Sequence, residues 1–122
     1  MYIKLEDLEL YKLSMEIGEE IWMLIKDWPT FSKFSLGNQI TRSADSIALN
    51  ISEGYGRYHY KENRNFCYYA RGSAFETKTA LQKAFKRELI SETQFSQLIS
   101  KMDKFLYMLN QYIKSIGTTN PS

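Results

Sequence analysis

Proline and glycine are rare over most of this chain, and this scarcity restricts the folds that it can adopt. Among 122 residues there are two prolines, Pro29 and Pro121, and six glycines. Both residue types interrupt helices, proline through its missing N–H and glycine through its backbone freedom. Between these interruptions apolar residues recur every three to four positions, which is the spacing of one face of an α-helix. No run alternates with a period of two, so strands are not expected.

The apolar spacing predicts four helices of similar length. They cover about residues 7–28, 36–55, 60–87 and 91–117. Short connections between helices of similar length favour antiparallel neighbours. We therefore expect one all-α domain, an antiparallel up-down-up-down four-helix bundle over residues 1–117, followed by a frayed tail at 118–122.

Local signals set the expected helix boundaries. Pro29 should end the first helix, because the residue before a proline avoids helical geometry. Ser35 is a candidate N-cap for the second helix, after an irregular loop that begins at Pro29. Ser91 and Gln94 form the capping-box pattern at the start of the fourth helix. Gly117 is the expected stop of that helix.

The composition excludes several classes of site. With one cysteine, Cys67, and one histidine, His59, the chain can form neither an internal disulfide nor the usual Cys/His zinc site. It also lacks a Gly-rich phosphate loop and an HExxH motif. Its longest apolar run, 21–25, is far shorter than a membrane span, and its start does not resemble a secretory signal. We expect a cytoplasmic protein that is not an enzyme and holds no metal or cofactor.

Charge is distributed unevenly along the chain. Residues 1–30 carry three basic and seven acidic side chains, whereas residues 57–88 carry eight basic and three acidic ones. Such a dipolar surface can steer a polyanion or pair one copy of the chain with another. The alternative is that both segments form ordinary solvated helix faces.

Aromatic residues make up 15% of the chain, more than four apolar stripes require. The surplus includes Trp22, Trp28, Phe31, Phe34, Phe75, Phe85, Tyr107 and some of Tyr55, Tyr58, Tyr60, Tyr68 and Tyr69. Exposed rings in a patch mark an interface, so this surplus favours self-association, with the acidic first helix of one copy near the basic third helix of the next. The alternative is that the tyrosines lie across the bundle rim with solvated hydroxyls.

Basic and aromatic residues are interleaved between Arg57 and Arg71, a pattern that can bind phosphates and stack on exposed bases. A structural role for these rings in the third helix is the alternative. The candidate nucleic-acid-binding residues are Arg57, Lys61, Arg64, Arg71, Lys78, Lys83, Lys86 and Arg87.

The second helix carries a polar stripe beside its apolar one. It consists of Gln39, Arg42, Ser43, Ser46, Asn50 and Glu53. No nucleophile with a base and an orienting group accompanies these residues, so we expect a hydrogen-bond network or a subunit contact rather than catalysis. We interpret Cys67 as an inert small apolar residue.

Two blocks of the sequence resemble a known family. Residues 46–57 read SIALNISEGYGR and resemble the motif S-I-x-x-N-I-x-E-G-[FY]-G-R, and residues 70–73 read ARGS. The motif is that of the four-helix bundle proteins found as reading frames in intervening sequences of bacterial 23S ribosomal RNA genes, the S23 ribosomal protein type. A related protein is the accessory variability determinant of diversity-generating retroelements. The resemblance extends over residues ~5–115.

The resemblance implies a ring of five identical bundles, suspected binding to RNA or ribosomal particles, and no enzymatic activity. The related accessory protein also binds a reverse transcriptase. We interpret the motif residues Asn50, Glu53, Gly54, Gly56, Gly72 and Ser73 as mainly architectural. Asn50, Glu53 and Arg71 are expected to bind one another or a neighbouring subunit.

The sequence therefore predicts a non-catalytic, homopentameric, RNA-binding protein with no membrane partner. The alternative is an adaptor or scaffold that binds a partner protein, such as a reverse transcriptase, and no nucleic acid.

Overall fold

The structure of the chain, a computed structural model, describes residues 3–118. Its elements are the 3₁₀ turn η1 (Leu5–Asp7), the helix α1 (Glu9–Ile25), the short helix α2 (Thr30–Ser32), the π-helical turn η2 (Lys33–Gly37), and the helices α3 (Asn38–Tyr55), α4 (Tyr60–Lys86) and α5 (Glu92–Ser115). The described part of the chain contains no strand. Most of the tail predicted over 118–122 lies outside the described residues.

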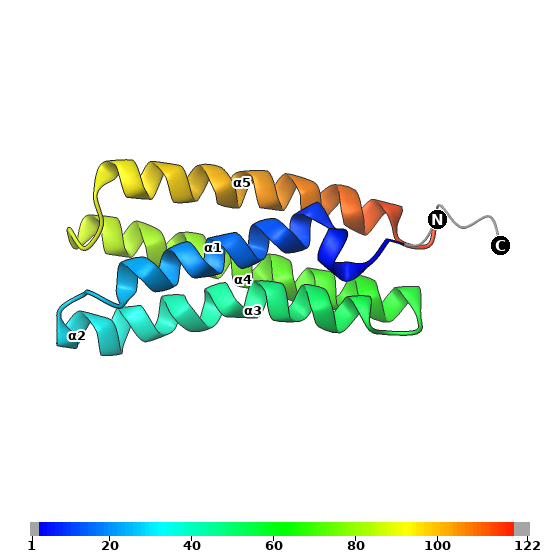
Figure 1. Cartoon of the computed structure of the whole chain (residues 1–122), viewed down its shortest axis with the longest axis horizontal. Helices are drawn as coiled ribbons and strands as arrows, with labels where there is room; N and C mark the ends of the chain where they lie inside the picture. The colour runs from blue at the N-terminus through cyan, green and yellow to red at the C-terminus, as the bar shows by residue number, and fades with distance from the viewer. Residues whose placement is uncertain (1–2, 119–122) are drawn as a thin grey trace.

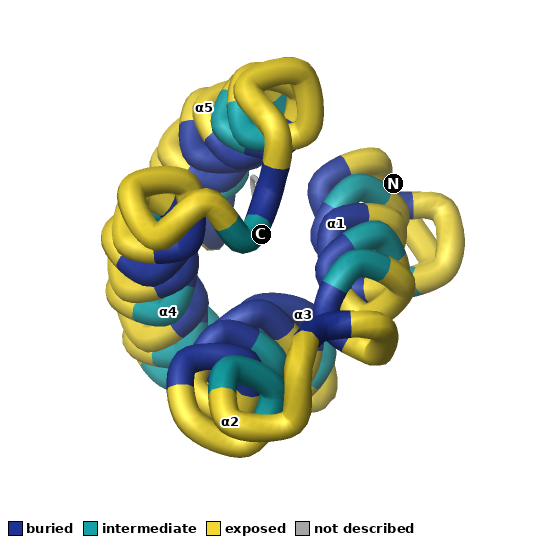
Figure 2. The backbone as a smooth tube through the Cα atoms, turned by 90° about the vertical axis from the view of Figure 1, so that its left-hand side faces the viewer, coloured by how far each residue is buried: buried dark blue, intermediate teal, exposed yellow. Residues whose placement is uncertain are grey.

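Four long helices run side by side as an antiparallel bundle (Figure 1). Seen end on, α1, α3, α4 and α5 follow one another around the bundle, so α1 and α4 lie on opposite sides (Figure 2). The buried residues face inward on all four helices, as the amphipathic spacing predicts. The expected all-α, up-down-up-down four-helix bundle is confirmed.

The core combines large side chains from three helices with small ones from α4. Ile17, Ile40 and Phe105 have no solvent exposure. The core face of α4 consists mainly of small residues, namely Cys67, Ala70, Ala74, Thr77, Ala80 and Ala84. Small residues let neighbouring helices approach α4 closely. Tyr69 of α4, one of the surplus tyrosines, is 58% exposed.

The second helix begins at Thr30 rather than at residue 36, so the expected loop is helical. Ser35 lies inside this helix and is not an N-cap, since its hydroxyl donates to the carbonyl of Phe31 at 2.6 Å. Pro29 directly precedes the helix with extended backbone angles, φ −53° and ψ 149°. A proline is tolerated at a helix start because the N–H that it lacks would have no intrahelical partner there. Pro29 therefore starts a helix, whereas α1 already ends at Ile25.

The fourth predicted helix begins and ends where its signals place it. The Ser91 hydroxyl accepts a bond from the Gln94 backbone N–H at 3.0 Å, and the Gln94 side chain accepts one from the Ser91 N–H at 2.9 Å. This reciprocal pair is the predicted capping box. Gly117 follows the helix with φ +81°, the left-handed region that favours glycine after a helix end.

The turn between α4 and α5 holds a glutamate in a backbone conformation that suits glycine. Leu89 N–H donates to the Ala84 carbonyl at 2.9 Å, and Glu88 N–H donates to the Phe85 carbonyl at 3.0 Å. This is the Schellman pattern, which places one residue in the left-handed region. That residue is Glu88, with φ 60°.

We expect Glu88→Gly to raise the free energy of unfolding by about 1 kcal/mol, because a side chain in this conformation costs roughly that much. Urea denaturation measures the change. Glu88→Ala is the matched control, since it removes the charge and keeps the strained Cβ. An equal gain from Glu88→Ala would show that charge, and not backbone strain, limits stability at this turn.

Candidate nucleic-acid interface

The first predicted cation, Arg57, is engaged within the chain. Its guanidinium forms ion pairs with Glu53 at 2.9 Å and with Glu62 at 3.5 Å. The guanidinium carbon also lies 4.8 Å from the centre of the Phe66 ring. Because these groups come from α3 and α4, Arg57 ties together the two ends of the turn between them.

Three further predicted cations join α4 to α5. They are Arg64, which donates to the Ile116 carbonyl at 3.1 Å, Arg71, which donates to Asn110 Oδ1 at 2.9 Å, and Lys78, whose Nζ lies 2.6 Å from Asp103 Oδ1. Partly exposed polar contacts of this kind are individually weak. Their placement indicates that these cations first of all connect two helices.

The other four predicted cations have no side-chain partner among the described residues. Lys61 lies in the first turn of α4, whereas Lys83, Lys86 and Arg87 lie at its far end. At 1.5 Å per residue, about 37 Å separates Lys61 from Lys86. The eight candidates therefore do not form one patch.

The far end of α4 and the beginning of the second helix lie at the same end of the bundle (Figure 1). A pocket of about 340 Å³ lies between them and is lined by Phe31, Ser32, Ser35, Leu36, Arg87 and Leu89. Phe31 is 85% exposed and Phe34 is 66% exposed. We call this surface the basic end and define it by Phe31, Lys33, Phe34, Lys86 and Arg87.

Three residues of the basic end are not among the nucleic-acid candidates that the sequence predicts, namely Phe31, Lys33 and Phe34. From the sequence alone, Phe31 and Phe34 are surplus aromatics, and Lys33 falls in the expected loop. The signal that identifies them is the proline at residue 29, which begins a helix and so brings this segment against the turn after α4.

The polar stripe of the second predicted helix forms a hydrogen-bond ladder between α3 and α4. The hydroxyls of Ser43 and Thr77 lie 2.8 Å apart, and those of Ser46 and Ser73 lie 3.0 Å apart. Asn50 Nδ2 donates to the Ser46 hydroxyl at 2.9 Å. Among the described residues, every buried side-chain nitrogen and oxygen has a hydrogen-bond partner. The predicted hydrogen-bond network is confirmed for Ser43, Ser46 and Asn50.

This ladder opens into a polar groove of about 420 Å³. Its lining is Gln39, Arg42, Ser43, Ser46, Ser73 and Glu76. Arg42 is exposed, and no ion pair or hydrogen bond joins its side chain to the rest of residues 3–118. The groove thus adds one cation to the surface.

Asn50, Glu53 and Arg71 do not bind one another. Asn50 donates to Ser46, Glu53 pairs with Arg57, and Arg71 binds α5. That part of the expectation is wrong, because Arg71 lies on the side of α4 that faces α5 rather than α3.

Two of the three motif glycines, Gly54 and Gly72, differ in their surroundings. At Gly54 an added Cβ would lie 2.7 Å from Asn63 Oδ1 and 2.8 Å from Phe66 Cβ, so glycine permits a close approach of α3 and α4. At Gly72 nothing lies within 4 Å of such a Cβ. Packing within one chain therefore explains why residue 54 is a glycine, but it does not explain the glycine at residue 72.

The residues capable of covalent or metal chemistry are isolated. Cys67 is fully buried, and burial raises the pKa of its thiol to about 11, so the thiol is protonated at neutral pH. His59 is exposed at the start of α4 and makes no side-chain cap. Across residues 3–118 no three His, Cys, Asp or Glu side chains are grouped to hold a metal ion. In the same range no helix is both long and apolar enough to cross a membrane.

Comparison with known proteins places this geometry in a family. The profile of a family described as the 23S rRNA-intervening sequence protein matches residues 6–111. A crystal structure from Bacteroides thetaiotaomicron, described as a protein with unknown function from the S23 ribosomal protein family, is similar with a TM-score of 0.79 and 25% sequence identity. The match covers 87% of this chain and 96% of that chain. A search of curated proteins finds no match.

Proposed function

The chain belongs to the family of 23S rRNA-intervening sequence proteins, and we propose from this premise that it is a non-catalytic homo-oligomer that binds RNA through the basic end. One observation carries the proposal. Arg87 lines the pocket between α4 and the second helix together with Phe31, Lys86 precedes it in the chain, and neither cation has a side-chain partner among the described residues.

The chemistry of the basic end suits single-stranded RNA. Cations that pair with phosphates release the counterions condensed on the strand, which makes binding dependent on salt. An exposed aromatic ring provides a face on which an unpaired base stacks, a contact worth about 1–3 kcal/mol per base. Phe31 and Phe34 present two such rings next to Lys33.

Exposed apolar side chains on α1 and α4 support self-association. Trp22 is 53% exposed and Met23 58% exposed on α1, and Phe75 is 54% exposed on α4. We propose five copies, the number that the family resemblance implies. Several basic ends in one assembly would bind a single RNA with an avidity greater than that of one copy.

The absence of a candidate catalytic set in the described residues supports a binding role. Cys67 is buried and protonated, and the hydroxyls of Ser43 and Thr77 are engaged in the ladder. The adaptor alternative shares this non-catalytic character and differs in lacking affinity for RNA.

Fluorescence anisotropy with a labelled single-stranded RNA tests the proposal between 50 and 200 mM salt, a range in which several phosphate contacts change affinity by orders of magnitude. We expect the triple variant Lys33→Ala, Lys86→Ala, Arg87→Ala to lose at least about tenfold in affinity and to show a shallower salt dependence. Phe31→Ala should weaken binding without changing the salt dependence, because it removes stacking alone.

A matched control removes three positive charges elsewhere. Lys4, Lys104 and Lys114 are exposed, and none has a side-chain partner among the described residues. Their triple alanine variant should retain affinity within about twofold, since distant exposed charges are largely screened at these salt concentrations. Equal losses in both triple variants would show non-specific attraction and would contradict the assignment to the basic end. If the unmodified protein binds no RNA at 50 mM salt, the RNA-binding proposal is contradicted and the adaptor function is the remaining alternative.

A further inference from the structure

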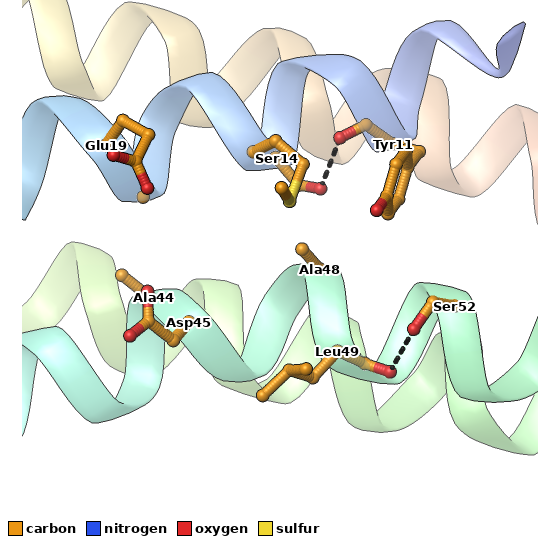
Figure 3. Close-up of a pocket in the computed structure, with 10 residues that line it drawn as sticks. Tyr11, Ser14, Glu19, Ala44, Asp45, Ala48, Leu49 and Ser52 are labelled. Atoms are coloured by element: carbon orange, nitrogen blue, oxygen red, sulfur yellow. Dashed lines mark hydrogen bonds between the residues drawn. The ribbon is translucent and has the colours of Figure 1, made fainter. Parts of the chain in front are cut away.

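A groove runs between α1 and α3, with a volume of about 330 Å³ (Figure 3). Its floor contains small residues, including Gly18 and the 8% exposed Ala48. Met15 and Leu49 stand at its rims with 46% and 66% of their surface exposed. A floor of small residues between apolar rims is a surface into which another helix can pack. We call it the α1–α3 groove.

Two carboxylates in this groove lack a cation. Glu19 and Asp45 both line it, and neither forms an ion pair with a described residue. Burial raises the pKa of Asp45, and the negative charge of Glu19 raises it further. By contrast, Glu16 and Glu20 on the α5 side of α1 each bind Lys101, at 2.6 and 2.7 Å. The α1–α3 groove therefore suits an occupant that brings both apolar surface and positive charge.

The outward side of α4 has these properties. Tyr68, Tyr69 and Phe75 are 44%, 58% and 54% exposed, and they surround Gly72. Because an added Cβ at Gly72 would meet nothing within 4 Å, the backbone itself forms the surface there. We call this surface the α4 face.

Unpaired cations lie at both ends of the α4 face. Lys61 and Lys83 are eleven residues before and after Gly72, which at 100° per residue keeps all three on one side of the helix. Glu76 is the one acidic side chain among the described residues of this face, so the face is positive in net charge. Its charge is thus opposite to that of the α1–α3 groove.

We propose that the α4 face of one copy docks in the α1–α3 groove of a second copy, an inference that rests on the self-association in the proposed function. Gly72 lets the α4 backbone approach the small-residue floor, and the aromatic rings cover Met15 and Leu49. The cations of α4 compensate Glu19 and Asp45. Charge complementarity between the two surfaces selects a second copy as the occupant.

The position of the two surfaces determines the kind of assembly. α1 and α4 lie on opposite sides of the bundle (Figure 2), so each copy offers both surfaces at once. An interface between two different surfaces is heterologous, and it builds rings or chains rather than closed two-fold dimers. The contact is therefore head to tail.

Two variants separate the halves of this interface. The groove variant combines Met15→Glu and Leu49→Glu, and the face variant combines Tyr69→Glu and Phe75→Glu. All four side chains are exposed, so the bundle is expected to stay folded, which circular dichroism verifies. Gel filtration with light scattering should show the wild-type chain as an assembly and each variant as a single copy.

Mixing the two variants is the decisive measurement. The groove variant retains an intact α4 face, and the face variant retains an intact groove, so an equimolar mixture should form a complex of two chains. Tyr107→Glu with Gln111→Glu adds two carboxylates to exposed positions of α5 and should leave the wild-type assembly intact.

Each contrary outcome has a distinct meaning. A wild-type chain that is a single copy at micromolar concentration contradicts both this interface and the self-association, while the RNA measurement stands separately. If either variant still assembles, or if the mixture forms no two-chain complex, this interface is contradicted. Self-association would then have to use another surface. Loss of assembly in the α5 control would show a general charge effect and would also contradict the interface.

Discussion

Gly54→Ala is expected to lower the free energy of unfolding by about 3 kcal/mol, the upper range for an added methyl group in a packed contact. The new Cβ would lie 2.8 Å from Phe66 Cβ and 3.0 Å from the backbone carbonyl oxygen of Asn63. Neither atom is the end of a flexible side chain, so α3 and α4 would have to separate. The ladder of hydroxyls between these helices would be disturbed as well.

Gly72→Ala is the matched substitution on α4, and it should raise the free energy of unfolding by up to about 1 kcal/mol, because alanine favours helix more than glycine does. Both changes are best measured by urea denaturation in the groove variant, so that subunit dissociation does not contribute. Equal effects of the two substitutions would contradict the close approach at Gly54.

Phe105→Ala is expected to lower the free energy of unfolding by about 4 kcal/mol. Phe105 is the largest of the fully buried side chains, and it belongs to the core cluster to which all four long helices contribute. The loss combines the transfer free energy of the ring with the cavity that remains. For a chain of this size about 4 °C in Tm corresponds to each kcal/mol, so Tm should fall by roughly 15 °C.

Tyr107→Ala is the control on the same helix. Tyr107 is 67% exposed, and its replacement should change the free energy of unfolding by less than about 0.5 kcal/mol. Thermal unfolding followed by circular dichroism measures both variants. A small effect of Phe105→Ala would mean that the core collapses around the missing ring.

The helices were predictable because their signals are local. The apolar period, the capping box at Ser91 and the glycine at residue 117 each act within a few residues, and the structure confirms them. The start of the second helix was not predicted, because Pro29 can precede a helix as readily as end one. The surplus of aromatic residues correctly indicated exposed rings, such as those of Phe31 and Phe75. Trp28, which was counted in the surplus, is instead buried, with 8% of its surface exposed.

The candidate site was only partly predictable. The sequence identified the cations of the third predicted helix, but it did not show which of them have partners. Arg71 binds Asn110, which is 39 residues away, and Arg64 binds a carbonyl at the end of α5, 52 residues away. Such contacts depend on the rotation of α4 about its axis in the bundle. The basic end likewise required the fold, because it joins residue 31 to residue 87.

The sequence by itself determined four amphipathic helices, their order and the family to which the chain belongs. These properties depend on periodicity, caps and short motifs, whose physics acts between residues close along the chain. Tertiary structure alone decided that Gly54 is packed and Gly72 open, and that Lys86 and Arg87 are unpaired while Arg57 is not. Those properties depend on which helix faces meet, and contacts between distant residues form only when the whole bundle is assembled.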